Sequence, residues 1–253
     1  MEKTLIPMQI VVLAAGHGKR MNNSDLPKVL APLKGKPIIK YLLEAIERSG
    51  VTTKPVIVVG QKSEMIKQAL RPEYDYVFQT EQLGTGQAVA CTAELLKNKV
   101  ANVMVLYGDH PLITPATIKR LAESHLNSSA VITMATVKLP DFSEWRSVFE
   151  VFGRISRDNQ ERVTGITEKK DASSDELKIT EVNPGYYCFK ADWLWNNLPK
   201  LKNDNAQQEY YLTDLAALAV RQGQEVNSLA IAAEEALGVN TSEQLKILES
   251  LII

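Results

Sequence analysis

The stretch Leu13-Ala14-Ala15-Gly16-His17-Gly18-Lys19-Arg20-Met21 follows directly after an apolar run that begins at Met8. Such a run is typical of a buried parallel strand. The two glycines beyond it let the backbone turn so that its N–H groups face an anion. Arg20 can hold phosphate oxygens through two hydrogen bonds, and Pro27-Lys28 adds a second cation. This combination predicts a phosphate-binding loop at the end of the first strand.

The spacing of this loop differs from the two common phosphate-binding fingerprints. A Walker A loop needs lysine and serine or threonine after its second glycine, and the dinucleotide fingerprint needs a third glycine before a helix. The glycines alone are also compatible with a purely structural turn. Arg20 and Lys28 together favour phosphate binding over that alternative.

Predicted strands and helices alternate along the first half of the chain. We expect a parallel, doubly wound sheet whose ligands lie at the carboxyl ends of the strands. Thr85 or Gly84 would cap one of its helices. The predicted strands span residues 8–15, 55–59, 74–78, 102–107 and 130–137, and the predicted helices span residues 37–49, 63–70, 85–96 and 115–125.

The second half of the chain has a different pattern. Three strand-like segments follow one another without intervening helices, and two helical segments come after them. We expect an antiparallel or mixed extension of the same sheet, and hence one domain over residues 1–253 with two lobes, 1–137 and 138–240, and a terminal helix at 241–253. The predicted strands span residues 153–158, 162–167 and 181–189, and the predicted helices span residues 209–222 and 241–251.

Composition excludes several classes of protein. The net charge of the 253 residues is −1 and no basic stripe is present, so general binding of nucleic acid is not expected. Cys91 and Cys188 lack the spacing of a zinc or redox motif. Residues 1–7 lack the apolar core of a signal peptide, and no apolar run approaches the length of a membrane span. We therefore expect a cytoplasmic protein that binds neither nucleic acid nor membrane.

The motifs resemble those of one enzyme family. The loop followed by Pro27-Lys28-Val29-Leu30 is similar to the start of the sugar nucleotidyltransferases. More narrowly, it resembles the uridylyltransferase half of the bifunctional N-acetylglucosamine-1-phosphate uridylyltransferase/glucosamine-1-phosphate acetyltransferase. The resemblance continues in order through residues 79–86, 106–113, 153–155, 168–172, 181–185, 205–214 and 238–240.

The resemblance implies both a fold and a reaction. The fold would be that of the nucleotide-diphospho-sugar transferases, a Rossmann-like mixed, mainly parallel sheet flanked by helices. The reaction would join UTP to N-acetylglucosamine 1-phosphate, with Mg²⁺ as cofactor, and give UDP-N-acetylglucosamine, a cell-wall precursor, and pyrophosphate. A phosphate oxygen of the sugar attacks the α-phosphorus in line, so positioning and charge neutralisation suffice and no covalent nucleophile is needed.

Asp109 and Asn240 are the expected metal ligands. Asp109 comes just after a buried strand, and Mg²⁺ prefers a few oxygen ligands and keeps several of its waters. From the sequence alone, Asp109 is otherwise a helix cap before Pro111 and Asn240 a cap for the last helix. The resemblance supplies the metal role of Asn240, and it implies Arg20, Lys28 and Asp109 as the catalytic residues.

The remaining site residues come from the same resemblance. Glutamine offers both an acceptor and donors, which a uracil edge requires, so Gln79 would contact the base. The nucleotide-binding residues implied are Leu13, Ala14, Ala15, Gly16, Gly18, Gln79, Gly84 and Thr85. The substrate-binding residues implied are Tyr107, Gly108, Gly153, Glu168, Asn183 and Asn240. His17, at the variable position of the loop, is expected to be exposed and inert, and neither His110 nor His125 has the spacing of a metal ligand.

The chain departs from the family pattern at several positions. Lys19, Pro184 and Leu237 stand where threonine, threonine and glutamate are usual, and residues 140–152 form a longer, aromatic segment. These departures bear on the choice of sugar, so a sibling enzyme for another sugar 1-phosphate or nucleotide and a non-catalytic nucleotide-sugar binder stay open. The motifs of the acetyltransferase half do not occur in this sequence, so we expect a monomer or weak dimer. We expect residues 140–152 to form one wall of the sugar pocket.

Overall fold

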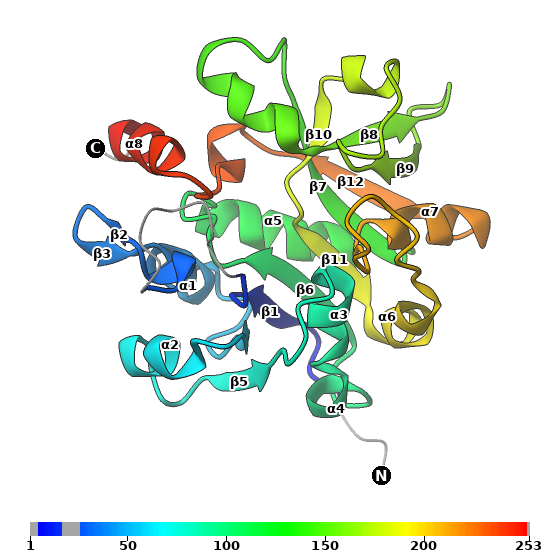
Figure 1. The fold of residues 1–253 in the computed structure, drawn as a ribbon. Coiled ribbons are helices and arrows are strands. Elements are labelled where there is room, and N and C mark those ends of the chain that lie inside the picture. Colours follow the sequence, from blue (N-terminus) through cyan, green and yellow to red (C-terminus); the bar gives the residue numbers. More distant parts are fainter. Residues whose placement is uncertain (1–4, 17–25, 252–253) are drawn as a thin grey trace.

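The computed structural model describes residues 5–16 and 26–251. Their centre is one mixed sheet in the strand order β5-β4-β1-β6-β11-β7-β10-β8-β9, and β12 also pairs with β7 (Figure 1). The strands are β1 (Gln9–Leu13), β4 (Val56–Val59), β5 (Asp75–Phe78), β6 (Asn102–Tyr107), β7 (Ile132–Lys138), β8 (Gly153–Arg157), β9 (Val163–Thr167), β10 (Glu181–Asn183), β11 (Tyr187–Lys190) and β12 (Val226–Ala230).

The two halves of the sheet differ in strand direction. β1 pairs in parallel with β4 and β6, and β4 pairs in parallel with β5, so four strands from the first half of the chain end at one edge. β11 is antiparallel to β6 and β7, and the β8–β9 pair is also antiparallel. The mainly parallel α/β fold and the mixed extension predicted from the sequence are therefore confirmed.

Helices cover both faces of the sheet because the apolar strands alternate their side chains between two cores. In β1, Ile10 and Val12 face one core and Val11 and Leu13 face the other. The first core packs against α1 (Ile38–Ser49), α2 (Ser63–Ala69), α5 (Pro115–Leu126) and α8 (Ser242–Leu251). The second packs against α3 (Thr85–Ala90), α4 (Ala93–Leu96), α6 (Ala191–Asn197) and α7 (Asp214–Arg221).

Short elements complete the fold. A small hairpin of β2 (Pro32–Leu33) and β3 (Lys36–Pro37) leads into α1, which ends at Gly50 in the left-handed conformation with φ 72°. The 3₁₀ helices are η1 (Lys28–Leu30), η2 (Glu144–Val151), η3 (Glu176–Lys178), η4 (Leu198–Lys200) and η5 (Glu234–Ala236). Among the described residues, no helix combines the length and the apolar character needed to cross a bilayer.

The prediction of one helix over residues 85–96 is wrong, because the structure has two helices, α3 and α4. Thr92 lies between them and is fully buried. Its hydroxyl donates to the Val89 carbonyl oxygen at 2.7 Å. A threonine that bonds back to the preceding turn competes with regular helical hydrogen bonding, and the chain re-enters a helix only after it.

Two predictions in the second half are also wrong in detail. The single strand over 181–189 is divided into β10 and β11, because Pro184 has no N–H to donate and Gly185 has φ 87°. The helix predicted over 209–222 begins only at Asp214. The Tyr210 main chain instead donates to Leu83 O and accepts from Gly86 N, at 2.7 and 2.8 Å.

The sequence patterns also missed α6 and β12. Both lie in segments for which the sequence patterns predicted neither a helix nor a strand. The expected succession of strands without intervening helices therefore holds only up to β11, because α6 follows it. The α6 sequence has four apolar side chains among its seven residues, of which Ala191, Leu194 and Trp195 are buried in the second core. A seven-residue helix presents too few turns for its period to stand out in the sequence.

His125 is a buried hydrogen-bonding residue of α5. Its Nδ1 lies 2.9 Å from Thr133 Oγ1, and its Nε2 lies 3.2 Å from Asn102 Oδ1. Burial, together with the nearby charge of Lys190, lowers the pKa of His125 from 6.5 to about 4. The folded protein therefore keeps this imidazole neutral at pH values where the unfolded chain begins to protonate it.

This difference predicts a pH-dependent stability. Between pH 6.5 and about 4 the unfolded state binds the extra proton on His125, so the contribution of His125 to stability falls as the pH falls. We expect the wild type to lose about 2 kcal/mol more unfolding free energy than His125→Gln between about pH 7 and 5. Urea unfolding at the two pH values measures both losses. Equal losses in the two proteins would show that His125 is not the group that titrates.

Candidate active site

The carboxyl ends of the parallel strands bring the predicted loops together. The main chain after β1 is tied to its neighbours on both sides: Ala14 N donates to Val58 O, and Gly108 N donates to Leu13 O, both at 2.9 Å. A Cβ on Gly108 would lie 3.2 Å from Leu13 O. The glycine after β6 therefore lets the turn before Asp109 approach the start of the loop, and this places Leu13–Gly16 beside Gly108 and Asp109.

A cation, a carboxylate and an amide meet beside this loop. Lys28 Nζ lies 2.5 Å from Asp109 Oδ2 and 2.8 Å from Asn240 Oδ1, although these residues are far apart in the sequence. Asp109 is only 6% exposed. Burial favours the neutral acid, but the Lys28 ammonium, together with His110 and a main-chain hydrogen bond, holds the pKa of Asp109 below its ordinary value. The carboxyl group is therefore an anion at neutral pH.

The same group of atoms fits a hard divalent cation. Asp109 and Asn240 both direct a side-chain oxygen at one positively charged atom, Lys28 Nζ. Carboxylate and amide oxygens are ligands that Mg²⁺ accepts, and a site of this kind needs only one or two from the protein. Within the described residues, no group of three or more His, Cys, Asp or Glu side chains could hold a metal. The two oxygens thus match a weakly chelated Mg²⁺ and not a closed protein cage.

The segment after β5 carries Gln79 and contacts the start of the glycine loop. Gln79 is buried, and its amide donates to Gln87 Oε1 at 2.6 Å and to Gly84 O at 3.3 Å. Gln82, which the sequence patterns did not single out, donates from Nε2 to Ala15 O at 2.5 Å. Gln82 therefore holds the main chain of the glycine loop directly, at Ala15. Only its place in the segment that resembles the family's nucleotide-reading loop could have drawn attention to it.

Gly84 and Thr85 are held against a distant loop. Gly84 has φ 109°, and a Cβ there would lie 2.7 Å from Tyr210 O, so a side chain would meet both strain and backbone. The Thr85 hydroxyl accepts a hydrogen bond from Leu212 N at 3.0 Å. The Gly84 turn therefore depends on close approach of residues 210–212, which explains a glycine at this position.

A second group of polar residues gathers around Glu168. Asn183 and Gly153 are opposite each other in the β10–β8 pair, and a Cβ on Gly153 would lie 3.5 Å from Glu168 Oε1. Thr213 Oγ1 donates to that same oxygen at 3.2 Å. Burial raises the pKa of Glu168, and so do the nearby carboxylates, although the Thr213 hydrogen bond lowers it. Three of the predicted sugar-side residues are thus adjacent.

Tyr107, the last residue of β6, lies near the group around Glu168. Burial and the charge of Glu168 raise the pKa of Tyr107, while a hydrogen bond with Thr85 lowers it. Gly185, which has φ 87°, lies so close to the Tyr107 ring that a Cβ there would overlap it. Asn183 Oδ1 accepts from Gly185 N at 3.0 Å, so the turn that contacts Tyr107 is itself held in place.

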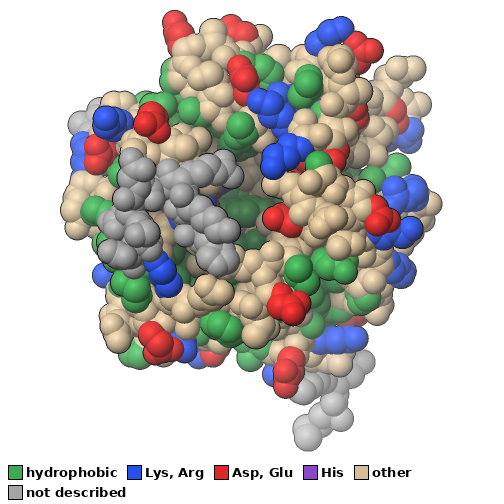
Figure 2. Space-filling model, viewed as in Figure 1, with side chains coloured by type: hydrophobic (Ala, Val, Ile, Leu, Met, Phe, Trp, Pro, Cys, Tyr) green, Lys and Arg blue, Asp and Glu red, His purple; other side chains and the backbone are tan. Residues whose placement is uncertain are grey.

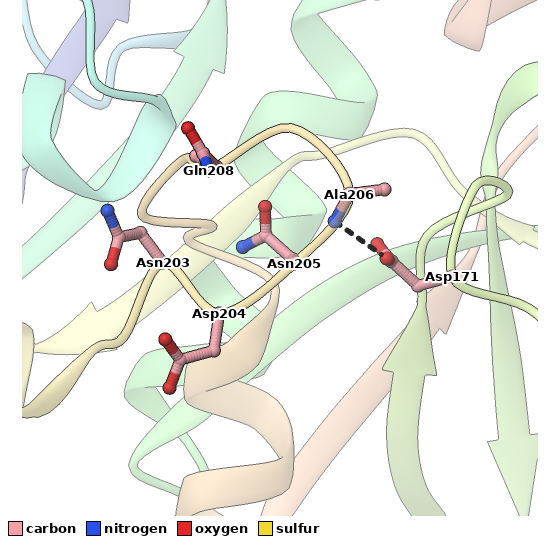
Figure 3. A pocket seen from close by; sticks show the side chains of 6 residues that line it. All are labelled: Asp171, Asn203, Asp204, Asn205, Ala206 and Gln208. Carbon is pink, nitrogen blue, oxygen red and sulfur yellow. Dashed lines mark hydrogen bonds between the residues drawn. The ribbon is translucent and has the colours of Figure 1, made fainter.

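A loop over residues 203–208 lies beside the Glu168 segment and forms a shallow hollow (Figure 3). Asp171 Oδ1 accepts from Ala206 N at 3.0 Å, and Lys170 donates to Gln207 Oε1 at 2.8 Å. These two bonds join the 168–172 segment to the loop that continues to Tyr210. The lining is polar and acidic: Asp171, Asn203, Asp204, Asn205, Ala206 and Gln208. The hollow is a by-product of this junction and lies apart from Lys28 and Asp109.

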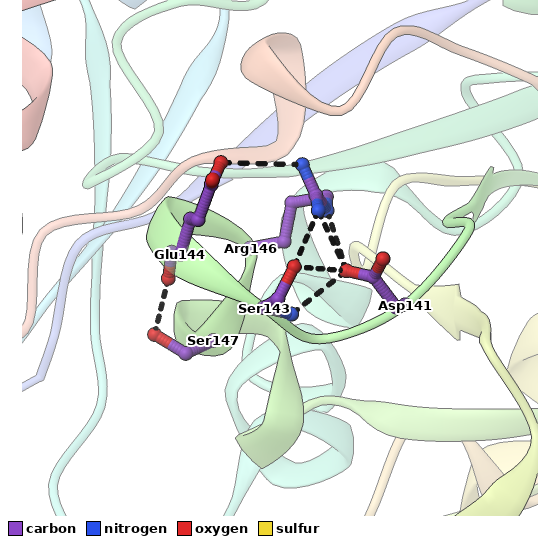
Figure 4. A network of polar contacts seen from close by, with 5 residues as sticks. All are labelled: Asp141, Ser143, Glu144, Arg146 and Ser147. Atoms are coloured by element: carbon purple, nitrogen blue, oxygen red, sulfur yellow. Dashed lines mark hydrogen bonds and ion pairs between the residues drawn. The ribbon is translucent and has the colours of Figure 1, made fainter.

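The aromatic segment 140–152 is folded back onto the first core. Phe149 is fully buried, and Phe142, Trp145 and Phe152 pack against the same core. A polar network at its start closes the turn into η2 (Figure 4): Asp141 Oδ1 accepts from Ser143 and from both Nε and Nη2 of Arg146. At its other end, Glu150 forms an ion pair with Lys169 at 3.6 Å, next to Glu168.

Besides Gln79, Gly84 and Thr85, which lie on the segment that Gln82 ties to Ala15 O, the described part of the predicted site forms two groups. Lys28, Asp109 and Asn240 form the first, beside Leu13–Gly16, and the Glu168 group forms the second. The face shown in Figure 2 is hollowed near its centre, next to the residues drawn in grey. Gly18 and Arg20 of the predicted loop, and His17, lie outside the described residues.

Comparison with known proteins identifies relatives of this chain. The chain is 41% identical over 231 residues to the bifunctional protein GlmU of Shouchella clausii, covering 91% of this chain and 49% of that protein. It is 40% identical over 243 residues to GlmU of Clostridium beijerinckii, covering 96% of this chain and 51% of that protein. The chain therefore spans about half the length of these curated relatives.

A solved structure shares the fold. It is a Bacillus anthracis protein provisionally assigned as a glucose-1-phosphate thymidylyltransferase, with a TM-score of 0.74 and 18% identity over 96% of this chain and 94% of that one. Residues 10–204 match the model of the MobA-like NTP transferase domain. That match covers more than half of the chain, and it confirms the family expected from the motifs. The protein belongs to the MobA-like NTP transferase domain family.

Proposed function

We propose that the protein is a uridylyltransferase that makes UDP-N-acetylglucosamine and pyrophosphate from UTP and N-acetylglucosamine 1-phosphate. The observation that carries the proposal is the meeting of Lys28, Asp109 and Asn240 at the end of the parallel strands, beside the glycine loop. These three groups come from separate parts of the sequence and gain little from one another as packing. Their position suits the transfer of a charged nucleotidyl group.

The nucleotide would lie along the first half of the sheet edge. Leu13–Gly16 and Gly18 would surround the triphosphate, with Arg20 and Lys28 neutralising its charge. Gln79 would face the uracil edge, and its present partner, Gln87, shows that its amide donates readily at that position. Gly84 and Thr85 would contact the base and ribose. Gln82 would hold the loop by its bond to Ala15 O.

The sugar phosphate would lie over the second group of residues. Glu168, Asn183 and Gly153 are adjacent and can bind hydroxyl and amide groups of a sugar. Tyr107 and Gly108 connect this group to Asp109. A sugar phosphate bound there would lie beside Asp109, and its phosphate oxygen would attack the α-phosphorus of the nucleotide in line.

Charge neutralisation would come from both sides of the reacting phosphorus. Lys28 would move its ammonium from Asp109 to the phosphate oxygens, where negative charge accumulates during the transfer. Asp109 and Asn240 would hold Mg²⁺, which supplies further positive charge to the phosphates when bound. Asp109 is suited to this role because its carboxyl group stays ionised at neutral pH.

A sibling activity toward another sugar 1-phosphate is the second candidate. It is favoured by the turn that contacts Tyr107, where Pro184 precedes Gly185 and divides β10 from β11. The Glu150–Lys169 ion pair lies next to Glu168 along the chain, and the Gly185 turn contacts Tyr107, so two of the departures from the family pattern lie on the sugar side. Release of pyrophosphate from a panel of triphosphates and sugar 1-phosphates tells the two candidates apart, and no release from any pair leaves a nucleotide-sugar binder.

Asp109→Asn tests the metal and cation group. The change keeps the shape of the side chain but removes the charge that Lys28 and a divalent cation share. We expect kcat for pyrophosphate release to fall by about 100-fold or more. Circular dichroism and the Tm check that the fold is kept. Asp175→Asn, at an exposed carboxylate of the same type, is the matched control and should keep full activity. Full activity in Asp109→Asn would contradict the metal assignment.

Gln79→Ala tests base recognition. Loss of one buried polar contact costs about 1–3 kcal/mol, so the preference for UTP over CTP in kcat/KM should fall by about tenfold or more. Gln68→Ala, on the exposed face of α2, is the control and should keep the preference of the wild type. If Gln79→Ala also keeps it, the base is recognised by another residue.

Glu150→Gln tests whether the 140–152 segment borders the sugar. Phe149 is fully buried, so deletion of the whole segment would also damage the core, and a point substitution is the cleaner experiment. Loss of the half-exposed ion pair with Lys169 should raise KM for the sugar 1-phosphate by up to about fivefold and leave KM for UTP unchanged. Glu144→Gln, an exposed position on the same 3₁₀ helix, is the control. Unchanged sugar kinetics in Glu150→Gln would argue that the segment serves the core alone.

A further inference from the structure

His110 occupies a buried position directly after Asp109 and forms a hydrogen bond across the fold. Its Nδ1 lies 2.8 Å from the hydroxyl oxygen of Tyr186, which is fully buried. The Tyr186 hydroxyl in turn donates to Glu235 O at 2.8 Å. A phenolic hydroxyl has one hydrogen to give, so His110 must donate from Nδ1. Three segments of the chain are thus joined in one directed pair of hydrogen bonds.

The imidazole is also enclosed by packing. Its ring stacks on Tyr107 with centroids 5.5 Å apart, and the Tyr186 ring meets it edge-on at 5.4 Å. A Cβ on Gly238 would lie 2.5 Å from His110 Nε2, so only glycine lets the main chain pass so close to the ring. His110 therefore contacts the sugar-side Tyr107 and the segment leading to Asn240 at the same time.

Residues 235–240 form a strap across the turn that carries Asp109 and His110. At one end, the Glu235 carboxylate accepts from Thr114 N, from Thr114 Oγ1 and from Thr117 Oγ1, at 3.0–3.1 Å. Near the other end, Val239 N donates to Asp109 O at 3.0 Å. Tyr186 holds the Glu235 end as well, through its hydrogen bond to Glu235 O, and the His110 ring lies against Gly238 between the two ends. Asn240 follows Val239 along the strap, and its Oδ1 accepts a hydrogen bond from Lys28 Nζ.

We propose that His110 is a positioning residue that, through Tyr186 and Gly238, holds the 235–240 strap so that Asn240 meets Asp109 and Lys28. The ring also couples this strap to Tyr107, so the metal side and the sugar side share one support. The metal part of the proposal rests on the proposed function, in which Asn240 is a ligand. Groups that orient metal ligands typically change metal affinity by about 10- to 100-fold when they are removed.

Tyr186→Phe is the central test because it removes one hydroxyl and keeps the ring that packs on His110. Two readouts are measured: hydrogen exchange of the Val239 amide, and the affinity for Mn²⁺ in the presence of UTP by electron paramagnetic resonance. We expect Val239 to exchange faster by about fivefold or more, and Mn²⁺ to bind about tenfold more weakly. Exchange in the β4 strand reports global unfolding, and Val239 should speed up by more than this strand does, because the lost hydroxyl is a local support of the strap.

Two further variants separate positioning from simple destabilisation. Tyr76→Phe removes a hydroxyl that donates to Arg71 O at 2.9 Å on the far edge strand, and it should change neither readout. His110→Ala should weaken Mn²⁺ binding as Tyr186→Phe does, whereas His110→Asn, whose amide can donate to Tyr186 from near the Nδ1 position, should restore part of the loss.

The possible results lead to different conclusions. Unchanged Val239 exchange in Tyr186→Phe would overturn the positioning role whatever the enzyme does. Faster exchange with unchanged Mn²⁺ affinity would overturn the link from the strap to the metal. Absence of Mn²⁺ binding with UTP in the wild type would overturn the proposed metal role of Asn240 and the metal part of this inference, whereas faster Val239 exchange in Tyr186→Phe would still support the positioning of the strap.

Discussion

The ion pair between Lys28 and Asp109 is the constraint on which the site depends. Both groups are largely buried, and removing two charges from water costs several kcal/mol per ion unless other partners compensate. Asn240 Oδ1 supplies such a partner to Lys28. The pair therefore requires a segment from the start of the chain, a strand end from its middle and a strap from its end to meet at one point, and the rest of the fold is arranged to bring them there.

The sheet meets that requirement through close main-chain contacts. Gly108 lies so near Leu13 O that a Cβ would be only 3.2 Å from it, a tight contact that glycine avoids where the Asp109 turn meets the glycine loop. On the other side, Gly185 and Gly238 allow the turn after β10 and the strap to touch Tyr107 and His110. Bulkier residues at these positions would push apart the layers that carry the reactive groups. The glycines thus allow the close main-chain contacts that place the charged residues near one another.

The sequence predicted the sheet well and its interruptions poorly. Apolar runs such as the one that forms β1 are typical of buried parallel strands, and their type and place were correct. The errors fall where one residue overrides the pattern: the Thr92 hydroxyl divides a helix, Pro184 divides a strand, and the Tyr210 main chain is taken up by Gly86 and Leu83. Each is a tertiary or local hydrogen-bonding effect that composition does not reveal.

The candidate site shows the same division. Asp109 stands out in the sequence because an acidic group directly beyond a buried strand gains nothing from the core, and Lys28 because it adds a second cation after the glycine loop. Asn240 came only from family resemblance. His110 and Tyr186 gave no signal, because their partnership joins residues 76 positions apart and a buried histidine beside a strand is ordinary packing by pattern. Reactive groups can be found by residue type and place along a strand. The residues that hold them at the right distance act through contacts between remote segments, so only the folded structure identifies them.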